Sequence, residues 1–305
     1  LRPSAGLRTN SVNLQMGADE SKSRQQILRD AQNDNIVGGK AKRNPQITPF
    51  GWAQDKFSEF AAGRKPETKG NTKRENVVLE LQGVTVPSKG ARNLLTDISF
   101  KLHAGEVIGI AGVEGNGQSE LTETILGLLE YEGNINFDNA PIDNLTVAAR
   151  RDLGIGFIPE DRHRQALMLG SPLWENRILG YQRKKPIFNG FILDKKATIE
   201  DTRVIMQEFD VRAPGPNSLA TALSGGNQQK FIVGREMVHA PKLLVASHPT
   251  RGVDVGAQGA IWEELRKARE KGMAIVLISA DLEELIGMSD RLLVMLRGEV
   301  TAELD

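Results

Sequence analysis

A glycine-rich segment at residues 112–119 carries the residue types and spacing of a phosphate-binding loop. It reads Gly-Val-Glu-Gly-Asn-Gly-Gln-Ser, follows the apolar run 107–111 and precedes a helical pattern at 120–129. In a strand–loop–helix arrangement, glycines let backbone N–H groups curl around phosphates, and the helix N-terminus adds its positive dipole end. We expect this phosphate site to consist of Gly112, Gly115, Asn116, Gly117, Gln118 and Ser119. A plain turn between a strand and a helix is the alternative.

Two side chains of this loop bear on the chemistry that it could support. Ser119 stands where a hydroxyl would reach Mg²⁺, and the preceding position, which is lysine in the usual motif, is Gln118. A lysine ammonium there would neutralise the β- and γ-phosphates, whereas glutamine offers only a neutral amide donor. The loop therefore keeps its backbone contribution and loses its main positive charge.

A second segment, Leu-Ser-Gly-Gly-Asn-Gln-Gln-Lys at 223–230, precedes a helix that we expect to open at Phe231. Its serine hydroxyl and glycine N–H groups would form an anion cradle at the helix N-terminus. The segment resembles the signature sequence of the ATP-binding cassette (ABC) family. In that family the cradle closes on the γ-phosphate of ATP held by a partner domain. The resemblance implies this role for Ser224, Gly225, Gly226, Asn227 and Gln228.

The remaining landmarks of the ABC family follow in the family's order between residues 77 and 305, and several of them carry unusual residues. Glu160 stands in place of the glutamine of one loop, and Ala280 replaces the histidine of the switch region. Ser247 and His248 replace the two acids that end an apolar strand. Asp254 lies in the segment that resembles the loop bridging two nucleotide sites.

These replacements imply a hydrolytic site with impaired chemistry. In the family a lysine neutralises phosphate charge, an aspartate orders Mg²⁺, a glutamate positions water and a histidine senses the γ-phosphate. Those four positions hold Gln118, Ser247, His248 and Ala280. We expect ATP and Mg²⁺ to bind weakly, through the backbone cradle and Ser119. A general-base role for His248, whose ordinary pKa lies near 6.5, is the alternative to an inert polar filler.

Neighbouring sequence narrows the resemblance to one branch of the ABC family. Pro-Glu-Asp-Arg-His at 159–163 and Pro-Thr-Arg-Gly-Val-Asp-Val-Gly-Ala at 249–257 are similar to the second, C-terminal and degenerate cassette of tandem import ATPases for sugars and nucleosides. The Ala-Ser-His at 246–248 is similar to the nucleoside type. The chain would then be the second half alone, as a fragment or as the product of a split or truncated gene.

The same resemblance implies partners and a location. We expect a second cassette, in tandem or as a dimer, and membrane permease subunits docked on residues 160–215. A solute-binding protein would take part indirectly. The chain would lie at the cytoplasmic face of the cell membrane as a peripheral subunit.

Two other functions stay open. A soluble non-transport ABC-type ATPase that acts on the ribosome or nucleic acid would use the basic front of the chain as an arm. An independently active ATPase homodimer would need no separate cassette. The import-type segments at 159–163 and 249–257 argue against the first of these.

The elements that must position these residues alternate between strand and helix. The spacing at 257–271 predicts a helix, and short apolar runs predict strands at 77–81, 94–102, 107–111, 156–158, 243–246, 274–279 and 292–296. Such alternation indicates a parallel sheet covered on both faces. The ABC resemblance implies a P-loop NTPase-type α/β domain with a mostly parallel core, an antiparallel β subdomain and an inserted helical subdomain at about 160–230.

Composition limits the alternatives further. The 305 residues carry 39 Lys and Arg against 39 Asp and Glu, yet residues 1–76 hold 14 basic and 8 acidic residues. We expect residues 1–75 to be a disordered basic tail and residues 76–305 to form the acidic ABC domain. The neutral total excludes an overall nucleic-acid field, and we expect no nucleic-acid partner. The lack of cysteine excludes disulfides, Cys-ligated zinc and thiol catalysis.

Overall fold

The structure is a computed structural model that describes residues 76–88, 90 and 92–304, all of which belong to the unit Thr68–Asp305. The tail expected at 1–75 lies outside the described residues.

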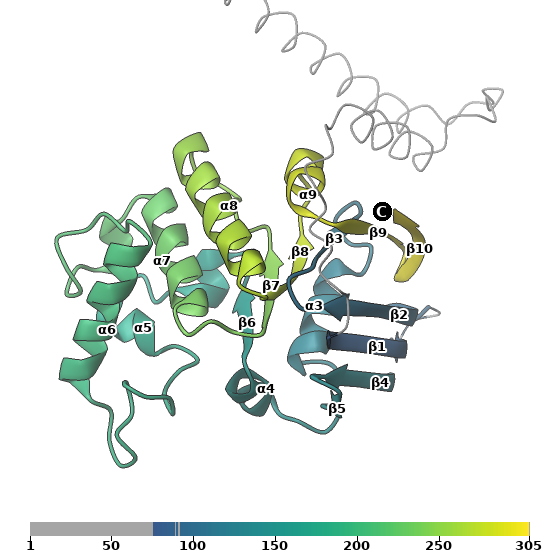
Figure 1. The fold of residues 1–305 in the computed structure, drawn as a ribbon, viewed down its shortest axis with the longest axis horizontal. Helices are drawn as coiled ribbons and strands as arrows, with labels where there is room; N and C mark the ends of the chain where they lie inside the picture. The colour runs from purple at the N-terminus through teal and green to yellow at the C-terminus, as the bar shows by residue number, and fades with distance from the viewer. Residues whose placement is uncertain (1–75, 89, 91, 305) are drawn as a thin grey trace, which may run out of the picture. The chain divides into compact units, whose positions relative to one another are not determined.

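A six-stranded sheet forms the centre of the domain (Figure 1). Its strand order is β10-β9-β3-β8-β7-β6. Parallel pairing joins β6 to β7, β7 to β8, β8 to β3 and β3 to β9, and the edge strand β10 is antiparallel to β9. The strand bounds are β3 Val107–Ala111, β6 Ile155–Ile158, β7 Leu243–Ser247, β8 Ala274–Ile278, β9 Arg291–Leu296 and β10 Glu299–Leu304. The mostly parallel core predicted from the apolar runs is confirmed.

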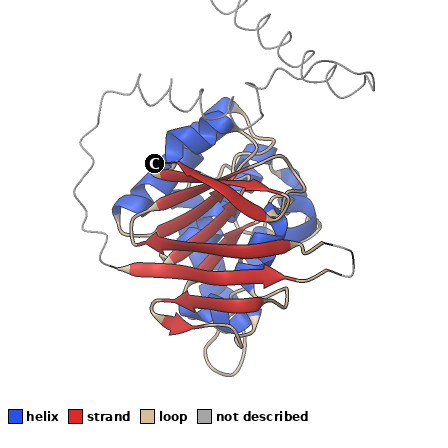
Figure 2. Ribbon diagram, turned by 90° about the vertical axis from the view of Figure 1, so that its right-hand side faces the viewer, coloured by secondary structure: helices blue, strands red, loops and turns tan. Residues whose placement is uncertain are grey.

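A second, four-stranded sheet is antiparallel, with the order β2-β1-β4-β5. Its strands are β1 Val77–Val86, β2 Leu95–His103, β4 Glu132–Phe137 and β5 Ala140–Pro141. In Figure 2 the strands face the viewer and most of the helices lie behind them. Leu79 and Ile98 of this sheet share one buried cluster with Ile108 and Val276 of the parallel sheet, so a single core joins both sheets.

Helices cover the parallel sheet and extend away from it. Figure 1 shows α5 and α6 at the end of the domain opposite the antiparallel sheet. The α-helices are α3 Gln118–Leu126, α4 Val147–Leu153, α5 Leu173–Ile178, α6 Lys195–Glu208, α7 Gly225–Met237, α8 Val255–Glu270 and α9 Leu282–Met288. A π-helix spans Arg162–Ala166 and a 3₁₀ turn spans Ala220–Ala222. The helical insertion expected in this fold is thus present between β6 and α7.

Two helix boundaries differ from those expected, and helix capping explains both. The α3 helix ends at Leu126 because Gly127 adopts a left-handed conformation with φ 80°. The α7 helix begins at Gly225, not Phe231, because the Ser224 hydroxyl accepts a hydrogen bond from the backbone N–H of Asn227. The signature glycines therefore form the first turn of α7.

A buried ion-pair network ties α7 to the sheet and to the helical insertion. The Glu236 carboxylate on α7 accepts hydrogen bonds from Arg151 (2.8 Å), Arg235 (3.0 Å), Tyr181 (3.2 Å) and the backbone N–H of Phe157 (3.3 Å). Burial alone would raise the pKa of Glu236, but the two guanidinium groups outweigh it and lower that pKa. The charge of Glu236 therefore compensates two largely buried arginines.

Replacing Glu236 with glutamine should destabilise the domain strongly, because it leaves Arg151 and Arg235 without their anion in a dry environment. We expect the free energy of unfolding to fall by about 3–5 kcal/mol in urea titrations. Glu208→Gln on the exposed surface of α6 is the matched control and should change it by less than about 0.5 kcal/mol. A loss below about 1 kcal/mol for Glu236→Gln would contradict this account.

Candidate functional site

The carboxyl ends of the parallel strands β3, β7 and β8 open onto one pocket of about 340 Å³. Strands that run parallel end at the same edge of a sheet, so the residues that follow them converge there. The pocket lining consists of Gly112, Glu114, Gly115, Gln118, Ser119, Glu160, Ser247, His248, Thr250, Arg251, Gln258, Ile278, Ser279, Ala280, Asp281 and Glu284. Eight residues of the sequence prediction thus meet here, from four separate segments of the chain.

Gln118 closes the phosphate loop upon itself. Its side-chain oxygen accepts a hydrogen bond from the backbone N–H of Asn116, and its amide nitrogen donates to the carbonyl of Val113, both at 3.1 Å. The side chain is buried, and a Cβ on Gly112 would lie only 2.6 Å from its amide nitrogen. One N–H group that a phosphate would need is therefore already paired within the loop.

The rest of the loop is held by contacts with the strand end beyond β9. The Asn116 amide donates to Val113 (2.8 Å) and accepts from the backbone N–H of Arg297 (2.7 Å). Gly117 has φ 107°, and an added Cβ would come within 3.0 Å of Leu95 and Met295, so only glycine fits. The predicted Asn116 and Gly117 thus shape the loop and do not line the pocket.

The positions that would handle Mg²⁺ and water hold neutral side chains. The buried Ser247 hydroxyl lies 3.4 Å from the Thr122 hydroxyl, which donates to the carbonyl of Gln118 (3.1 Å). Ser119 is exposed at the pocket and remains the hydroxyl that would contact Mg²⁺. Within the described residues, no group of three or more His, Asp and Glu side chains is placed to hold a metal ion.

His248 is fixed in an unusual backbone conformation with φ 48°. Its backbone N–H donates to the carbonyl of Ile278 (2.7 Å), and its Nδ1 accepts from the backbone N–H of Ala280 (3.3 Å). Burial lowers the pKa of His248 below its ordinary value, and Arg251 lowers it further against the opposing carboxylates. A neutral imidazole has one lone pair for accepting a proton, and here Nδ1 uses it on the backbone. This pairing argues against a general-base role.

The pocket is more acidic than a triphosphate site requires. Four carboxylates line it, from Glu114, Glu160, Asp281 and Glu284, and Arg251 forms an ion pair with Glu160. Repulsion from these groups opposes the binding of a polyanion whose lysine partner is also missing.

Glu284 is a pocket residue that the sequence reasoning missed. It is 1% exposed and accepts hydrogen bonds from the Thr250 hydroxyl (2.8 Å) and the Trp262 indole (2.9 Å). In the sequence, the only indication of this residue is a glutamate in the first turn of the helix after Ala280. Its hydrogen-bond partners lie 22 and 34 residues away along the chain, so local sequence does not reveal them.

The signature residues form a separate surface, and none of them lines the pocket. Ser224 is exposed at the N-terminus of α7, and its hydroxyl also accepts from the Asn227 amide (3.0 Å). Gln228 instead points into the domain, where its amide donates to Ala220 (3.0 Å) and its oxygen lies 2.9 Å from His163 Nε2. The surface that could meet a ligand is thus the Ser224 hydroxyl and the first turn of α7.

The signature glycines permit a close approach of the inter-site loop. A Cβ on Gly226 would lie 3.0 Å from the Asp254 carboxylate and from Ala257, and one on Gly225 would lie 2.8 Å from the Arg162 guanidinium. Asp254 caps α8 by accepting from the backbone N–H of Ala257 (2.9 Å). The backbone N–H of Ala257 accordingly lowers the pKa of Asp254.

Arg162, which the sequence reasoning did not single out, joins three of the predicted segments. Its guanidinium donates to the carbonyls of Arg251 (2.8 Å) and Gly252 (3.3 Å) and to the Gln228 side chain (3.4 Å). The Arg251 side chain in turn forms an ion pair with Glu160, two residues before Arg162. These contacts of Arg162 and Arg251 therefore link the pocket to the signature segment at the start of α7.

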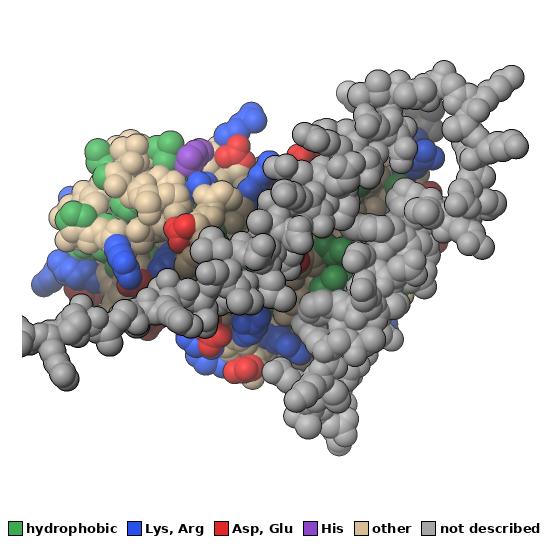
Figure 3. Space-filling view, turned by 90° about the horizontal axis from the view of Figure 1, so that it is seen from above, with side chains coloured by type: hydrophobic (Ala, Val, Ile, Leu, Met, Phe, Trp, Pro, Cys, Tyr) green, Lys and Arg blue, Asp and Glu red, His purple; other side chains and the backbone are tan. Residues whose placement is uncertain are grey.

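The charge distribution on the surface and the apolarity of the helices limit which other partners the domain could have. Figure 3 shows acidic and basic side chains interspersed over the part of one face that the grey atoms leave visible. None of the helices in the described part of the chain has the length and apolarity to cross a membrane.

Residues 95–251 match the sequence model of the ABC transporter family. The chain belongs to the ABC transporter family. Its fold is the P-loop NTPase fold of ABC ATPases. Similar solved structures include a nucleotide-free ATP-binding cassette from an ABC transporter (24% identity, TM-score 0.65, covering 74% of this chain and 90% of that one). Another is a dimeric post-hydrolysis cassette bound to ADP and phosphate (23% identity, TM-score 0.64, covering 74% and 97%).

Curated relatives are import proteins. The guanosine import ATP-binding protein NupO of Bacillus subtilis (strain 168) is 40% identical over 83% of this chain and 50% of its own length. The nucleoside import ATP-binding protein NupA of Lactococcus lactis subsp. cremoris (strain MG1363) is 38% identical, covering 80% and 49%. The ribose import ATP-binding protein RbsA of Lacticaseibacillus paracasei is 36% identical, covering 75% and 45%. The chain spans about half the length of the curated relatives it matches.

The imidazole of His248 should titrate below 6.5 and carry its proton on Nε2 at pH 7, because Nδ1 accepts from Ala280. Histidine ¹⁵N NMR, assigned with His248→Asn, measures both properties. Since the folded-state pKa lies below the unfolded value, this group stabilises the fold above about pH 6.5. That contribution is lost as the pH falls through the folded-state pKa. A proton on Nδ1, or a pKa above 6.5, would contradict the hydrogen bond.

Proposed function

We propose that this chain is a nucleotide-binding domain of an importer for nucleosides or simple sugars. In this proposal its own ATP site is impaired, and its signature residues complete the ATP site of a partner cassette. The observation that carries the proposal is the contrast between two surfaces. The side-chain amide of Gln118 forms hydrogen bonds within its own phosphate loop, whereas Ser224 is exposed to solvent at the start of α7.

The impaired state follows from the groups at the four replaced positions. Gln118, Ser247, His248 and Ala280 supply no fixed charge to a phosphoryl group or to Mg²⁺, and the pocket adds four carboxylates. Removing one stabilising group from such a site typically costs about 10²–10³ in rate, and the effects need not add. We infer that ATP binds here weakly, with Ser119 as the contact for Mg²⁺.

The signature surface keeps what a γ-phosphate requires. A serine hydroxyl and the N–H groups of Gly225 and Gly226 favour an anion, and the helix dipole adds to them. Arg162 connects α7 to the inter-site loop by donating to the Gln228 side chain and to the carbonyls of Arg251 and Gly252. Hydrolysis at the completed partner site would close and open the cassette pair and drive transport.

The assembly that we propose follows the printed functions of the relatives. They import guanosine, nucleosides and ribose, and this chain spans about half of each. We infer that it corresponds to the second, degenerate cassette of such a protein. It would lie at the cytoplasmic membrane face and dock on permease subunits, with a solute-binding protein delivering the solute. These import relatives favour transport over an ATPase acting on the ribosome or nucleic acid.

A complementation experiment tests whether the signature works in trans. The restored variant carries Gln118→Lys, Ser247→Asp, His248→Glu and Ala280→His, and a second version of it also carries Gly225→Asp. The added aspartate would face Arg162 and repel a γ-phosphate. Wild-type chain alone should show negligible turnover, and so should the version with Gly225→Asp. Their mixture should hydrolyse ATP at least about a hundredfold faster than either, measured as phosphate release.

Two controls frame this result. The restored variant with intact Gly225 should be active alone, because each copy then supplies both halves of a site. Wild type carrying Gly225→Asp should fail to complement. Turnover of about 1 s⁻¹ by wild type alone would overturn the impaired site. An inactive mixture beside an active restored variant would overturn the signature role, and a restored variant no faster than wild type would overturn the assignment of the four positions.

A further inference from the structure

A short hairpin in the connection between α5 and α6 is built to hold its tip out in solvent. Phe188 and Leu193 form an antiparallel bridge. The Asn189 side chain accepts hydrogen bonds from the backbone N–H groups of Phe191 and Ile192, both at 3.1 Å, and Gly190 takes φ 103°. We call residues 187–194 the Phe191 hairpin. The connection that contains it extends below α5 and α6 in Figure 1.

The tip of the Phe191 hairpin consists of large apolar side chains. Phe191 is 93% exposed, Ile192 68% and Leu193 46%, whereas Ile187 at its base is fully buried. Three consecutive large apolar residues on an ordered, protruding turn exceed the single exposed residues that are normal on a surface. The hairpin is therefore anchored by one apolar residue and presents three others outward.

Lysines surround the base of this apolar tip. Asp194 donates its backbone N–H to the carbonyl of Ile187 (2.7 Å), so Lys185 on one flank and Lys195 and Lys196 on the other all lie near the base of the hairpin in the chain. Within residues 76–88 and 92–304, neither Lys185 nor Lys196 forms an ion pair, and Lys195 lies over the Trp174 ring at 4.6 Å.

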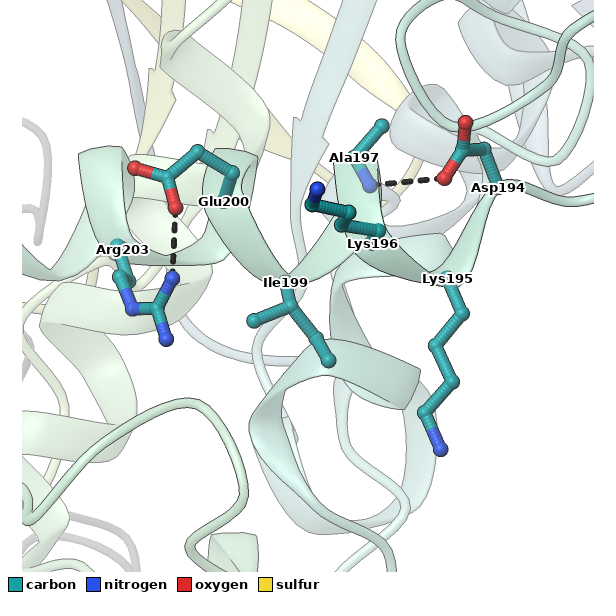
Figure 4. A pocket seen from close by; sticks show the side chains of 7 residues that line it. All are labelled: Asp194, Lys195, Lys196, Ala197, Ile199, Glu200 and Arg203. Atoms are coloured by element: carbon teal, nitrogen blue, oxygen red, sulfur yellow. Dashed lines mark hydrogen bonds and ion pairs between the residues drawn. The ribbon is translucent and has the colours of Figure 1, made fainter.

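The neighbouring acid at the hairpin base is already engaged. Asp194 uses its carboxylate to cap α6, accepting from the backbone N–H of Ala197 (2.9 Å). Figure 4 shows this capping bond and shows Lys195, Lys196 and Ile199 projecting from the start of α6. Among the described residues, the charges of Lys185 and Lys196 are thus left without an acidic partner, while Lys195 packs on Trp174.

We propose that the Phe191 hairpin docks onto an anionic membrane surface. Phe191 and Ile192 enter the boundary between headgroups and acyl chains, and the three lysines contact lipid phosphates and carboxylates. A convex apolar tip with a basic base matches the chemistry of an interfacial anchor, in which apolar burial and attraction to anionic lipids add. The inference rests on the proposed function only in that a transport assembly brings the chain next to a membrane.

Co-sedimentation of the full chain with vesicles tests the tip. Vesicles of phosphatidylcholine with one quarter phosphatidylserine should bind wild type at about 0.1 M salt, and phosphatidylcholine alone should bind it at least about tenfold less. Phe191→Ser with Ile192→Ser should lower the partition coefficient at least about tenfold. Leu128→Ser with Leu153→Ser, at exposed leucines outside the hairpin, is the matched control and should leave it unchanged.

Charge and insertion are measured separately. Lys185, Lys195 and Lys196 changed to glutamine should lower binding at least about tenfold. The same change at Arg266 and Lys267 on α8 and at Lys271, which directly follows α8, should not. Phe191→Trp should show a blue-shifted tryptophan fluorescence on binding the anionic vesicles. The basic first 76 residues are present in every variant, so their contribution is constant across the comparison.

Each contrary outcome overturns the anchor. The membrane anchor is refuted if the wild-type chain does not bind anionic vesicles. It is also refuted if both the apolar and the lysine variants of the hairpin bind them as well as wild type does. Loss with the lysine variant without a Phe191→Trp blue shift refutes insertion. If wild type does not bind vesicles but co-purifies with a permease, and the hairpin variants lose that co-purification, the hairpin contacts protein instead of lipid. The vesicle assay needs no nucleotide or partner cassette, so its failure is distinct from failure of the complementation test.

Discussion

The site depends on one constraint, the parallel pairing of β3, β7 and β8. In that pairing Ile110 and Ser247 both lie opposite Ile278, so the phosphate loop, His248 and the Ala280 turn must leave the sheet side by side. The buried aliphatic residues of these strands hold that register, whatever the loops contain. The scaffold of a nucleotide site therefore persists when its charged groups are replaced.

The neutral side chains at positions 118, 247 and 248 form hydrogen bonds within the domain. Gln118 hydrogen-bonds its own loop, Ser247 meets Thr122, and His248 accepts from the backbone beyond β8. Gln118, Ser247 and the Nδ1 atom of His248 thus all have hydrogen-bond partners within the domain. A nucleotide would have to displace at least the Gln118 contact to Asn116 and face the four carboxylates.

Sequence reasoning located the sheet and the site because both follow from local patterns. Apolar runs predicted β3, β7 and β8, and the glycine spacing predicted the loop between β3 and α3. It could not show that Gln118 turns back on its loop, because that depends on a side-chain rotamer. Arg162 and Glu284 escaped notice because their partners lie far along the chain: the carbonyls that Arg162 contacts are 89 and 90 residues away. The sequence placed Ser224 at a helix N-terminus but predicted the first helical residue at Phe231, whereas the Ser224 cap starts α7 at Gly225.

The glycine and serine residues of the signature turn have different structural roles. Gly226 packs closely against Asp254 and Ala257, so its presence would follow even in a domain that meets no partner. Ser224 caps α7, a role that aspartate or asparagine would fill equally well. An aspartate there would repel a phosphate, whereas serine tolerates one. Folding alone therefore does not specify serine at this exposed cap.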